Sequence, residues 1–213
     1  MKTLDEIGLE CKTDKASSTH GYLNTYEKYF SDLREKEFVL LELGVAAGNS
    51  IKMWKLFFPN AKIYGIDNNP DCATDGIFIG SQTDTAFLDS VLAEIGAPDI
   101  VIEDASHYGP YTIETFKYLF PKIANKGFYF VEDTHCFYDV TYGCAPPFGQ
   151  GMSDVFNFFT SLACDVDVHG RGMTGNTEYA LKVENPNFAL VPKYSEILDS
   201  MHIHPSLWLF KRK

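Results

Sequence analysis

The sequence predicts an α/β fold in which helices cover both faces of a mostly parallel, doubly wound sheet. Near-continuous apolar runs alternate with amphipathic stretches between residues 38 and 131. Runs of that kind are typical of strands that are buried on both faces. Breaker residues such as Pro59 and Gly127 separate these runs from the amphipathic stretches, as expected for alternating strands and helices.

The expected elements follow in chain order. Strands are predicted over 38–43, 61–66, 76–79, 99–103 and 127–131, with helices over 50–58, 83–95 and 110–123. Aromatic residues at helical spacing within 1–37 predict a short helix that packs on the body. After residue 134 we expect a lid-like loop over 143–151, a helix over 153–162, and strands over 164–169, 178–184 and 206–211. The chain 1–213 is expected to be one domain, with an N-terminal helical cap (1–37) and a catalytic core (38–213).

The composition excludes several classes of protein. The 213 residues include 18 Lys+Arg and 29 Asp+Glu, which gives a formal net charge of −11. Non-specific binders of nucleic acids or anionic membranes rely on basic residues, so neither partner is expected. The five cysteines are widely spaced without a CxxC pair, which argues against a disulfide framework or a zinc site. The acidic N-terminus is unlike a signal peptide, and no apolar run reaches the roughly 18 residues of a membrane span, so we expect a cytoplasmic protein.

A glycine loop follows the first predicted strand. Gly44 and Gly48 permit a tight turn and a close approach of the backbone to a ligand, and the next helix points its N-terminus there. The second strand ends in Asp67, about 20 residues after Gly48, where an acidic residue hydrogen-bonds ribose hydroxyls in nucleotide-binding folds. The combination of strand, glycine turn, helix and strand-end acid therefore indicates a cofactor that contains a nucleoside.

Acidic and histidine side chains follow the fourth and fifth predicted strands. Asp104 and His107 follow the fourth strand, and Glu132, Asp133 and His135 end the fifth. Ligands of doubly wound sheets lie at the carboxyl ends of the strands, so these groups are expected to converge. Clustered carboxylates resist ionisation unless a cation balances them, and three oxygen ligands suit Mg²⁺ or Mn²⁺. The alternative is that Glu103 or Glu132 caps a helix or pairs with a lysine. These strand ends form a rim along one edge of the sheet. The imidazole of His107 at this rim is a candidate general base.

These motifs resemble class I S-adenosylmethionine-dependent methyltransferases, whose first motif reads E-x-G-x-x-x-G and matches Glu42, Gly44 and Gly48. The D-x-S-H segment at 104–107 and the E-D-x-H segment at 132–135 narrow the resemblance to metal-dependent sugar O-methyltransferases of macrolide and related pathways. Residues 12–15 are similar to a G-T-D-K segment of that group, with Lys12 in place of the glycine. Residues 202–211 resemble its closing hairpin. The resemblance implies a seven-stranded, Rossmann-like sheet.

The resemblance also implies roles for individual residues. Asp104, Glu132 and Asp133 would bind Mg²⁺ (or Mn²⁺), and the catalytic residues would be His107, Asp104 and His135. S-adenosylmethionine would contact Thr13, Tyr22, Glu42, Gly44, Ala46, Gly48, Asn49, Ser50, Asp67, Asn68, Ser81, Gln82, Asp84 and Asp104. Within this set, the turn that contains Ser81, Gln82 and Asp84 would contact the adenine. Asp84 equally suits the N-cap of the next helix.

The predicted activity is methyl transfer from S-adenosylmethionine to a hydroxyl of a sugar or of a glycosylated or nucleotide-linked small molecule. His107 would deprotonate the metal-bound hydroxyl. Alternatives are the same chemistry on a phosphorylated small molecule or a catechol-like diol, and a related metal-dependent hydroxylase. A nicotinamide dehydrogenase is disfavoured because the G-x-G-x-x-G pattern is missing. Loop 139–151 and the stretch 169–176, with Arg171, are expected to contact the acceptor. The sequence leaves the acceptor's identity and self-association open.

Overall fold

The computed structural model describes residues 1–143, 154–169 and 194–213. Its centre is a seven-stranded sheet with the order β3-β2-β1-β4-β5-β7-β6. The parallel strands are β1 (Val39–Leu43), β2 (Lys62–Asp67), β3 (Ile77–Ile79), β4 (Ile100–Glu103) and β5 (Phe128–Glu132). A C-terminal hairpin of β6 (Leu198–His204) and β7 (Leu207–Arg212) completes the sheet, with β7 antiparallel to β5. The predicted mostly parallel, seven-stranded sheet is therefore confirmed, and the sheet is mixed rather than fully parallel.

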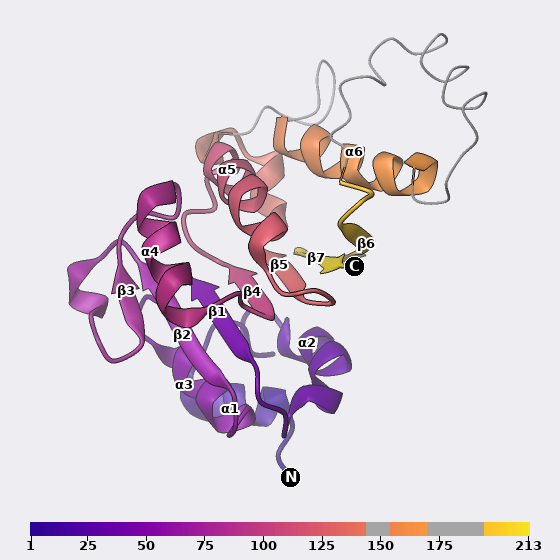
Figure 1. Cartoon of the computed structure of the whole chain (residues 1–213). Helices are drawn as coiled ribbons and strands as arrows, with labels where there is room; N and C mark the ends of the chain where they lie inside the picture. The colour runs from indigo at the N-terminus through magenta and orange to yellow at the C-terminus, as the bar shows by residue number, and fades with distance from the viewer. Residues whose placement is uncertain (144–153, 170–193) are drawn as a thin grey trace, which may run out of the picture.

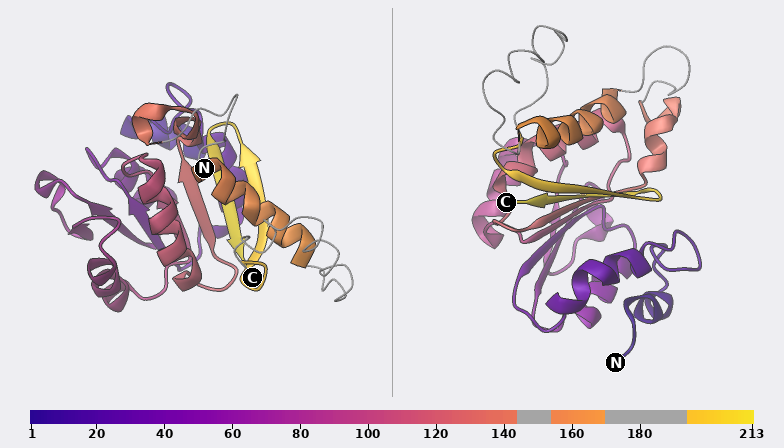
Figure 2. Two further views of the ribbon diagram at one scale, coloured as in Figure 1. Left: turned by 90° about the horizontal axis from the view of Figure 1, so that it is seen from above. Right: turned by 90° about the vertical axis from the view of Figure 1, so that its right-hand side faces the viewer.

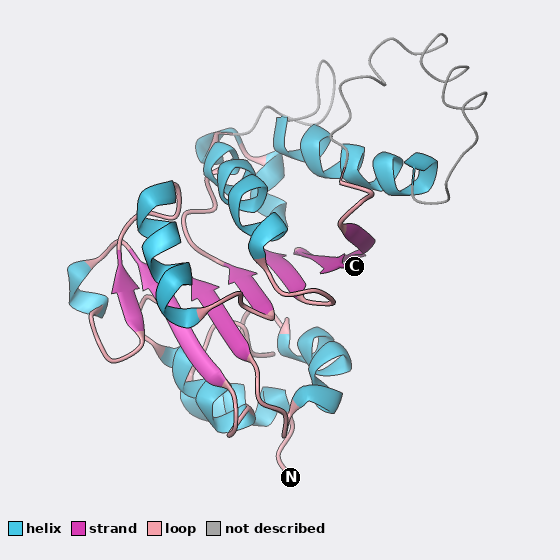
Figure 3. Ribbon diagram, viewed as in Figure 1, coloured by secondary structure: helices cyan, strands magenta, loops and turns pink. Residues whose placement is uncertain are grey.

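Helices lie on both faces of the sheet (Figures 1 and 2). On one face are α1 (Leu4–Cys11), α2 (Leu23–Phe30) and α3 (Asn49–Phe57). On the other face are α4 (Thr85–Ile95), α5 (Gly109–Leu119) and α6 (Asp154–His169). Figure 3 shows the alternation of helix and strand along the chain that the sequence predicts.

Two apolar clusters, one on each face of the sheet, explain the near-continuous apolar runs of the strands. Leu40, Ile102 and Phe130 belong to the cluster beneath α1, α2 and α3. Their neighbours along the strands, such as Leu41 and Val101, belong to the cluster beneath α4, α5 and α6. Because successive side chains of a strand point to opposite faces, a sheet covered on both sides needs apolar residues at both kinds of position.

The N-terminal segment packs on the sheet through the aromatic face that its spacing predicts. Leu23, Tyr26 and Phe30 of α2 are completely buried. The ring of Tyr26 meets the edge of Trp54 and lies against Phe130, with ring centroids 5.5 and 4.7 Å apart. The segment contains a further helix, α1, whose N-terminus carries a capping box formed by Thr3 and Glu6.

The region after residue 134 departs from the prediction in two places: the sequence does not predict β6 (Leu198–His204), and one expected strand is part of a helix. The expected strand over 164–169 is wrong, because these residues continue α6 to His169. The alternation of polar and valine residues there suggests a strand, but the buried positions Val155, Phe159 and Leu162 follow helical spacing, and Val166 extends their stripe. The strand over 206–211 is confirmed as β7. The expected strand over 178–184 and Arg171, and all of loop 143–151 except Gly143, lie outside the described residues.

The described part of the chain contains no helix with the length and apolar character that a bilayer crossing requires.

The residue that follows α1 has a left-handed backbone. Lys12 has φ 60° and ψ 36°, and its N–H bonds back to the carbonyls of Gly8 and Leu9. This is the position at which helices usually end in glycine, because a Cβ atom is strained there. The glycine of the similar G-T-D-K segment therefore has a physical reason, and the lysine in this chain carries a cost.

We expect Lys12→Gly to raise the free energy of unfolding by about 1 kcal/mol, since relief of strain outweighs the added freedom of the unfolded chain. For a chain of this size that gain raises Tm by about 2–4 °C, which denaturant and thermal unfolding would measure. Lys12→Ala is the matched control, because it removes the same long side chain but keeps the Cβ. An equal gain in both variants would contradict the backbone explanation.

Candidate functional site

The glycine turn between β1 and α3 is fixed by Asp67 at the end of β2. Asp67 Oδ2 accepts hydrogen bonds from the N–H groups of Val45 and Ala46 at 2.8 and 2.9 Å. Burial opposes ionisation of Asp67, but these N–H groups and that of Asn69 lower its pKa below the usual value. Asp67 is therefore a carboxylate. The turn requires Gly44, which has φ 88°, since a Cβ there would lie 2.0 Å from the carbonyl oxygen of Asp104.

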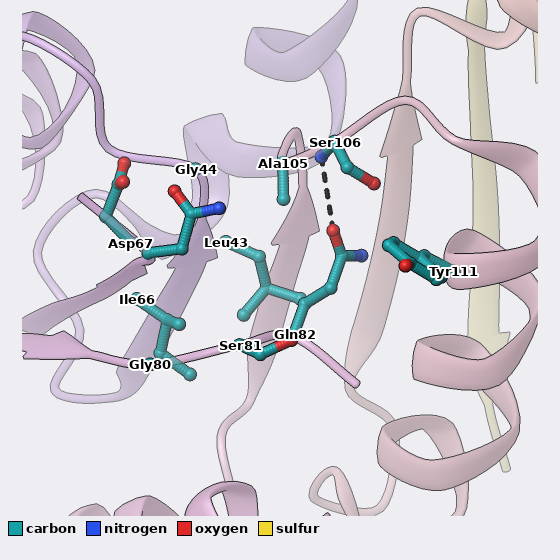
Figure 4. Close-up of a pocket in the computed structure, with 11 residues that line it drawn as sticks. Leu43, Gly44, Ile66, Asp67, Gly80, Ser81, Gln82, Ala105, Ser106 and Tyr111 are labelled. Carbon is teal, nitrogen blue, oxygen red and sulfur yellow. Dashed lines mark hydrogen bonds between the residues drawn. The ribbon is translucent and has the colours of Figure 1, made fainter. Parts of the chain in front are cut away.

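Two adjoining pockets lie at the carboxyl ends of the strands and share Gly44, Asp67 and Ala105. Figure 4 shows the first pocket, with Asp67 and Tyr111 at opposite ends of the view. The second pocket extends from the glycine turn to the segment that follows α1. The first pocket is lined by the predicted cofactor residues Gly44, Asp67, Asn68, Ser81 and Gln82. The second is lined by Thr13, Gly44, Ala46, Asn49, Ser50, Asp67 and Asp104.

The turn after β3 is fastened to the neighbouring strand by Gln82. Its Nε2 donates to Glu103 Oε1 at 2.9 Å. Its Oε1 accepts from the Ser106 N–H at 3.1 Å, as Figure 4 shows. Because both ends of the amide are engaged, Gln82 shapes the wall of the first pocket. Asp84 lies outside both pockets and accepts hydrogen bonds from the N–H groups of Ala86 and Phe87. Of its two predicted roles, the structure therefore shows the helix N-cap.

Three other predicted cofactor residues do not line the two pockets. Glu42 is completely buried, and its Oε2 accepts a hydrogen bond from Ser50 at 2.8 Å. Burial raises the pKa of Glu42 to about 7, against the opposing effect of Lys15. Gly48 precedes α3 with φ 75° and faces a separate hollow beside α3. Tyr22 donates to Asp133 Oδ1 at 2.6 Å and lies 3.1 Å from Ser206 Oγ. Glu42, Gly48 and Tyr22 therefore lie outside the two pockets. Contact of these residues with the cofactor stays a prediction.

The strand-end residues Asp104, His107 and Asp133 form the cluster that the sequence predicts. One ligand atom from each lies within 4.8 Å of the other two. His107 Nε2 lies 3.5 Å from Asp133 Oδ2 and 3.9 Å from Asp104 Oδ1. Both His107 and Asp133 have a left-handed backbone, with φ 53° and 52°. Strained residues of this kind are concentrated at functional sites, where the surrounding structure must hold them in place.

Two further histidines surround Asp133. His20 stacks on Tyr22 and places Nδ1 3.9 Å from Asp133 Oδ1. His135 places Nδ1 3.7 Å from the same oxygen and 2.6 Å from Ser206 Oγ. His135 therefore stands at the rim, as predicted, but its side chain is 61% exposed and a catalytic role stays a prediction.

The predicted metal ligand Glu132 is engaged elsewhere. Lys15 Nζ lies 2.8 Å from its Oε2, and the Tyr26 hydroxyl donates to its Oε1 at 2.6 Å. The structure does not bring Glu132 into the cluster of Asp104, His107 and Asp133, and it shows the alternative, a pair with a lysine. As a metal ligand, Glu132 would have to exchange these partners, so that role stays a prediction.

Lys15 belongs to the site, although the sequence does not predict it as a site residue. It is 1% exposed, and its ammonium contacts Asp104 and Glu132 and lies 3.4 Å from Glu42 Oε1. Burial lowers the pKa of Lys15, but Glu132, Asp104 and Glu42 outweigh burial and raise it well above the usual value. The ammonium therefore stays charged. The one available signal was its place in the segment that resembles G-T-D-K.

The residues present fit a divalent cation and a nucleoside cofactor. Asp104 and Asp133 each offer a carboxylate oxygen near Nε2 of His107, and Mg²⁺ is commonly held by one or two carboxylates with waters in its other positions. Gly44 has no side chain, so a ligand can approach its backbone closely. Asp67 places an ionised carboxylate at the wall shared by both pockets.

The chain has the fold of a class I methyltransferase. A solved structure of MycE methyltransferase from the mycinamycin biosynthetic pathway, in complex with Mg, SAH and mycinamycin VI, matches 99% of this chain and 54% of its own, with a TM-score of 0.79. At 24% sequence identity, this match establishes the fold. No family model matches the chain.

Curated proteins that are similar to the chain are sugar O-methyltransferases. A tetracenomycin rhamnosyl 3'-O-methyltransferase of Streptomyces olivaceus is 38% identical over 67% of this chain and 39% of its own length. Mycinamicin VI 2''-O-methyltransferase of Micromonospora griseorubida is 35% identical over 61% of this chain and 35% of its own. The chain is thus a homologue of the macrolide and sugar O-methyltransferases, and the resemblance seen in the sequence is confirmed. The matches span less than two-fifths of these relatives' own length.

Proposed function

We propose that this chain transfers the methyl group of S-adenosylmethionine to a hydroxyl of a sugar-containing small molecule, with Mg²⁺ or Mn²⁺ as cofactor. One observation carries the proposal: the nucleoside-type pocket, with its Asp67 carboxylate, adjoins a pocket that contains Asp104, His107 and Asp133. The relatives support a sugar acceptor, since their names specify methylation of rhamnosyl and olivosyl groups.

The two pockets bind different parts of the cofactor in this proposal. In the proposed complex, Asp67 accepts hydrogen bonds from the ribose hydroxyls, and the Ser81–Gln82 turn borders the adenine in the first pocket. The second pocket, between the glycine turn and Thr13, receives the methionine part and directs the methyl group toward Asp104. The sulfonium is a reactive methyl donor, so the main tasks of the protein are orientation and removal of a proton.

The rim performs the proton chemistry. A bound divalent ion supplies positive charge that makes the acceptor hydroxyl more acidic. Asp104 and Asp133 would hold the ion. The His107 imidazole takes the hydroxyl proton as that oxygen attacks the methyl carbon, and the carbon–sulfur bond breaks to release S-adenosylhomocysteine. The Tyr22 hydroxyl keeps Asp133 oriented through its 2.6 Å hydrogen bond.

We further propose that the cap (1–37) and the core (38–213) act as one catalytic unit in the cytoplasm. The cap residues Thr13 and Asp14 line the second pocket, and Lys15 reaches the strand-end carboxylates. Self-association and the identity of the acceptor stay open.

Titration of the folded protein with S-adenosylhomocysteine tests the cofactor assignment. We expect one-site binding in calorimetry, and about 10- to 100-fold weaker binding for Asp67→Ala, because hydrogen bonds to a charged group are worth about 1.5–3 kcal/mol. Asp71→Ala is the matched control, since Asp71 is exposed and lies outside both pockets. Absence of binding to the folded protein would overturn the proposal.

Product analysis separates the acceptor classes. Deoxysugar glycosides, a phosphorylated sugar and a catechol are each incubated with S-adenosylmethionine and MgCl₂, and methylated product is measured by mass spectrometry. We expect methylation of the glycosides. Oxygen consumption with a hydroxylated product, and with S-adenosylmethionine unconsumed, would support the hydroxylase alternative instead.

A further inference from the structure

Lys12 is held in a strained conformation beside the second pocket. Its backbone is left-handed, and its N–H bonds back to the carbonyls of Gly8 and Leu9 at the end of α1. Its own carbonyl accepts a hydrogen bond from Asn49 Nδ2 of α3 at 3.1 Å. The backbone of this lysine is therefore fixed on both sides, by α1 and by the helix that follows the glycine turn. Strained residues that are held in this way are concentrated at functional sites.

Acidic residues outnumber lysines on the wall of the second pocket. Besides His107, its charged lining consists of Asp14, Asp67, Asp104, Asp133, Lys12 and Lys15. The buried ammonium of Lys15 is already engaged by Asp104 and Glu132. Lys12 is exposed, and it forms no ion pair with any residue that the structure describes. The Lys12 ammonium is therefore the positive charge that this pocket can offer to a ligand.

The cofactor proposed for this pocket carries one group that needs such a charge. The methionine part of S-adenosylmethionine has an α-carboxylate, whereas its sulfonium and its ammonium are positive. An acidic wall attracts the two cations and repels the carboxylate, and a partly enclosed site strengthens both effects. A lysine ammonium beside the carboxylate offsets this repulsion and donates charge-assisted hydrogen bonds to it.

We propose that Lys12 binds the α-carboxylate of the cofactor and so positions the methionine part in the second pocket. This inference rests on the proposed methyl-transfer function. The similar G-T-D-K segment has a glycine at this place, so the contact is particular to this chain. The strained lysine lowers stability, and tighter binding of the cofactor is the gain that accompanies this cost. A loss of stability in exchange for function is common at ligand sites.

Calorimetry with two matched ligands tests the contact. S-adenosylmethionine and decarboxylated S-adenosylmethionine differ only in the α-carboxylate, and each is titrated into the unaltered protein and into Lys12→Met. Methionine keeps the Cβ and the approximate length of lysine but removes its charge. We expect Lys12→Met to bind S-adenosylmethionine about 5- to 15-fold more weakly, between the effects of an exposed ion pair and a charge-assisted hydrogen bond. Its affinity for the decarboxylated ligand should be unchanged or higher, because that ligand brings only positive charges to the pocket.

Lys52→Met is the matched control, because Lys52 is an exposed lysine of α3 outside the second pocket and its loss changes the net charge equally. Its affinities for both ligands should equal those of the unaltered protein. Lys12→Gly should combine higher stability in thermal unfolding with the same loss of affinity for S-adenosylmethionine. A purely structural role, in which the lysine only complements the dipole of α1 at its C-terminus, does not predict that loss.

The possible failures can be told apart. Equal weakening of both ligands by Lys12→Met, or no change for either, would overturn the inference and leave the proposed function intact. A change confined to the KM of a phosphorylated acceptor, with the affinity for S-adenosylmethionine unaltered, would overturn it as well, because Lys12 would then bind the acceptor. Failure of the unaltered protein to bind S-adenosylmethionine would instead count against the proposed function itself.

Discussion

Replacing Asp133 with asparagine is expected to lower the rate of the proposed methyl transfer by about 10²- to 10³-fold. The change removes one negative charge from the cation site, and charge stabilisation by a bound metal is worth several kcal/mol. Asparagine suits the test because it tolerates the left-handed backbone of this position, and its Oδ1 can still accept the Tyr22 hydrogen bond. The measurement is the initial rate as a function of MgCl₂ concentration.

Binding of S-adenosylhomocysteine to Asp133→Asn should stay close to that of the unaltered protein, since the nucleoside pocket is unchanged. Asp89→Asn provides the control: Asp89 pairs with Lys122 on the surface, away from the rim, and its loss should leave the rate unchanged. A chelator should abolish the activity of the unaltered protein. Full activity of Asp133→Asn in chelator would show that the metal assignment is wrong.

Replacing His107 with asparagine is expected to lower the rate by about 10²- to 10⁴-fold, the range typical of a lost general base. His107 has φ 53°, and asparagine is among the residues that accept this backbone, so the loss can be assigned to the imidazole. The affinity for S-adenosylhomocysteine and the Mg²⁺ dependence of the residual rate are measured alongside.

His202→Asn is the matched control for His107→Asn. His202 lies on β6, and its Nδ1 is 3.3 Å from the Tyr29 hydroxyl, remote from the two pockets. The same substitution there should leave the rate unchanged. If His107→Asn retains more than a tenth of the activity, another group takes the proton, and His20 and His135 become the next residues to replace.

The part of the site that could be predicted is the part built on strand ends. Asp67, Asp104 and Asp133 each follow an apolar run, and parallel strands bring their carboxyl ends to one edge of the sheet. That geometry is local to each strand, so a single sequence is enough to place these residues near one another. The antiparallel pairing of β7 with β5 does not disturb this edge, since Asp67, Asp104 and Asp133 all end or follow parallel strands.

The part that could not be predicted depends on contacts between distant segments. Lys15 stands in a polar stretch, and lysine is almost never fully buried, so the expectation for such a residue is exposure to solvent. Its burial follows from the docking of the cap on β1, β4 and β5. Asp165 is similar: its alternating neighbours suggest a strand, yet it is buried in α6 and accepts a hydrogen bond from the Ser195 N–H at 2.6 Å.

Ser206, at the tip of the C-terminal hairpin, has a consequence for the order of folding. Its hydroxyl lies 2.6 Å from His135 Nδ1 and 3.1 Å from the Tyr22 hydroxyl, so residues that are 184 positions apart meet beside Asp133. Contacts of such long range form late, because the entropy of closing the loop is lost before they contribute. During synthesis these two contacts therefore cannot form until the hairpin has left the ribosome. The contacts of Ser206 with Tyr22 and His135 are therefore among the last contacts beside Asp133 to form.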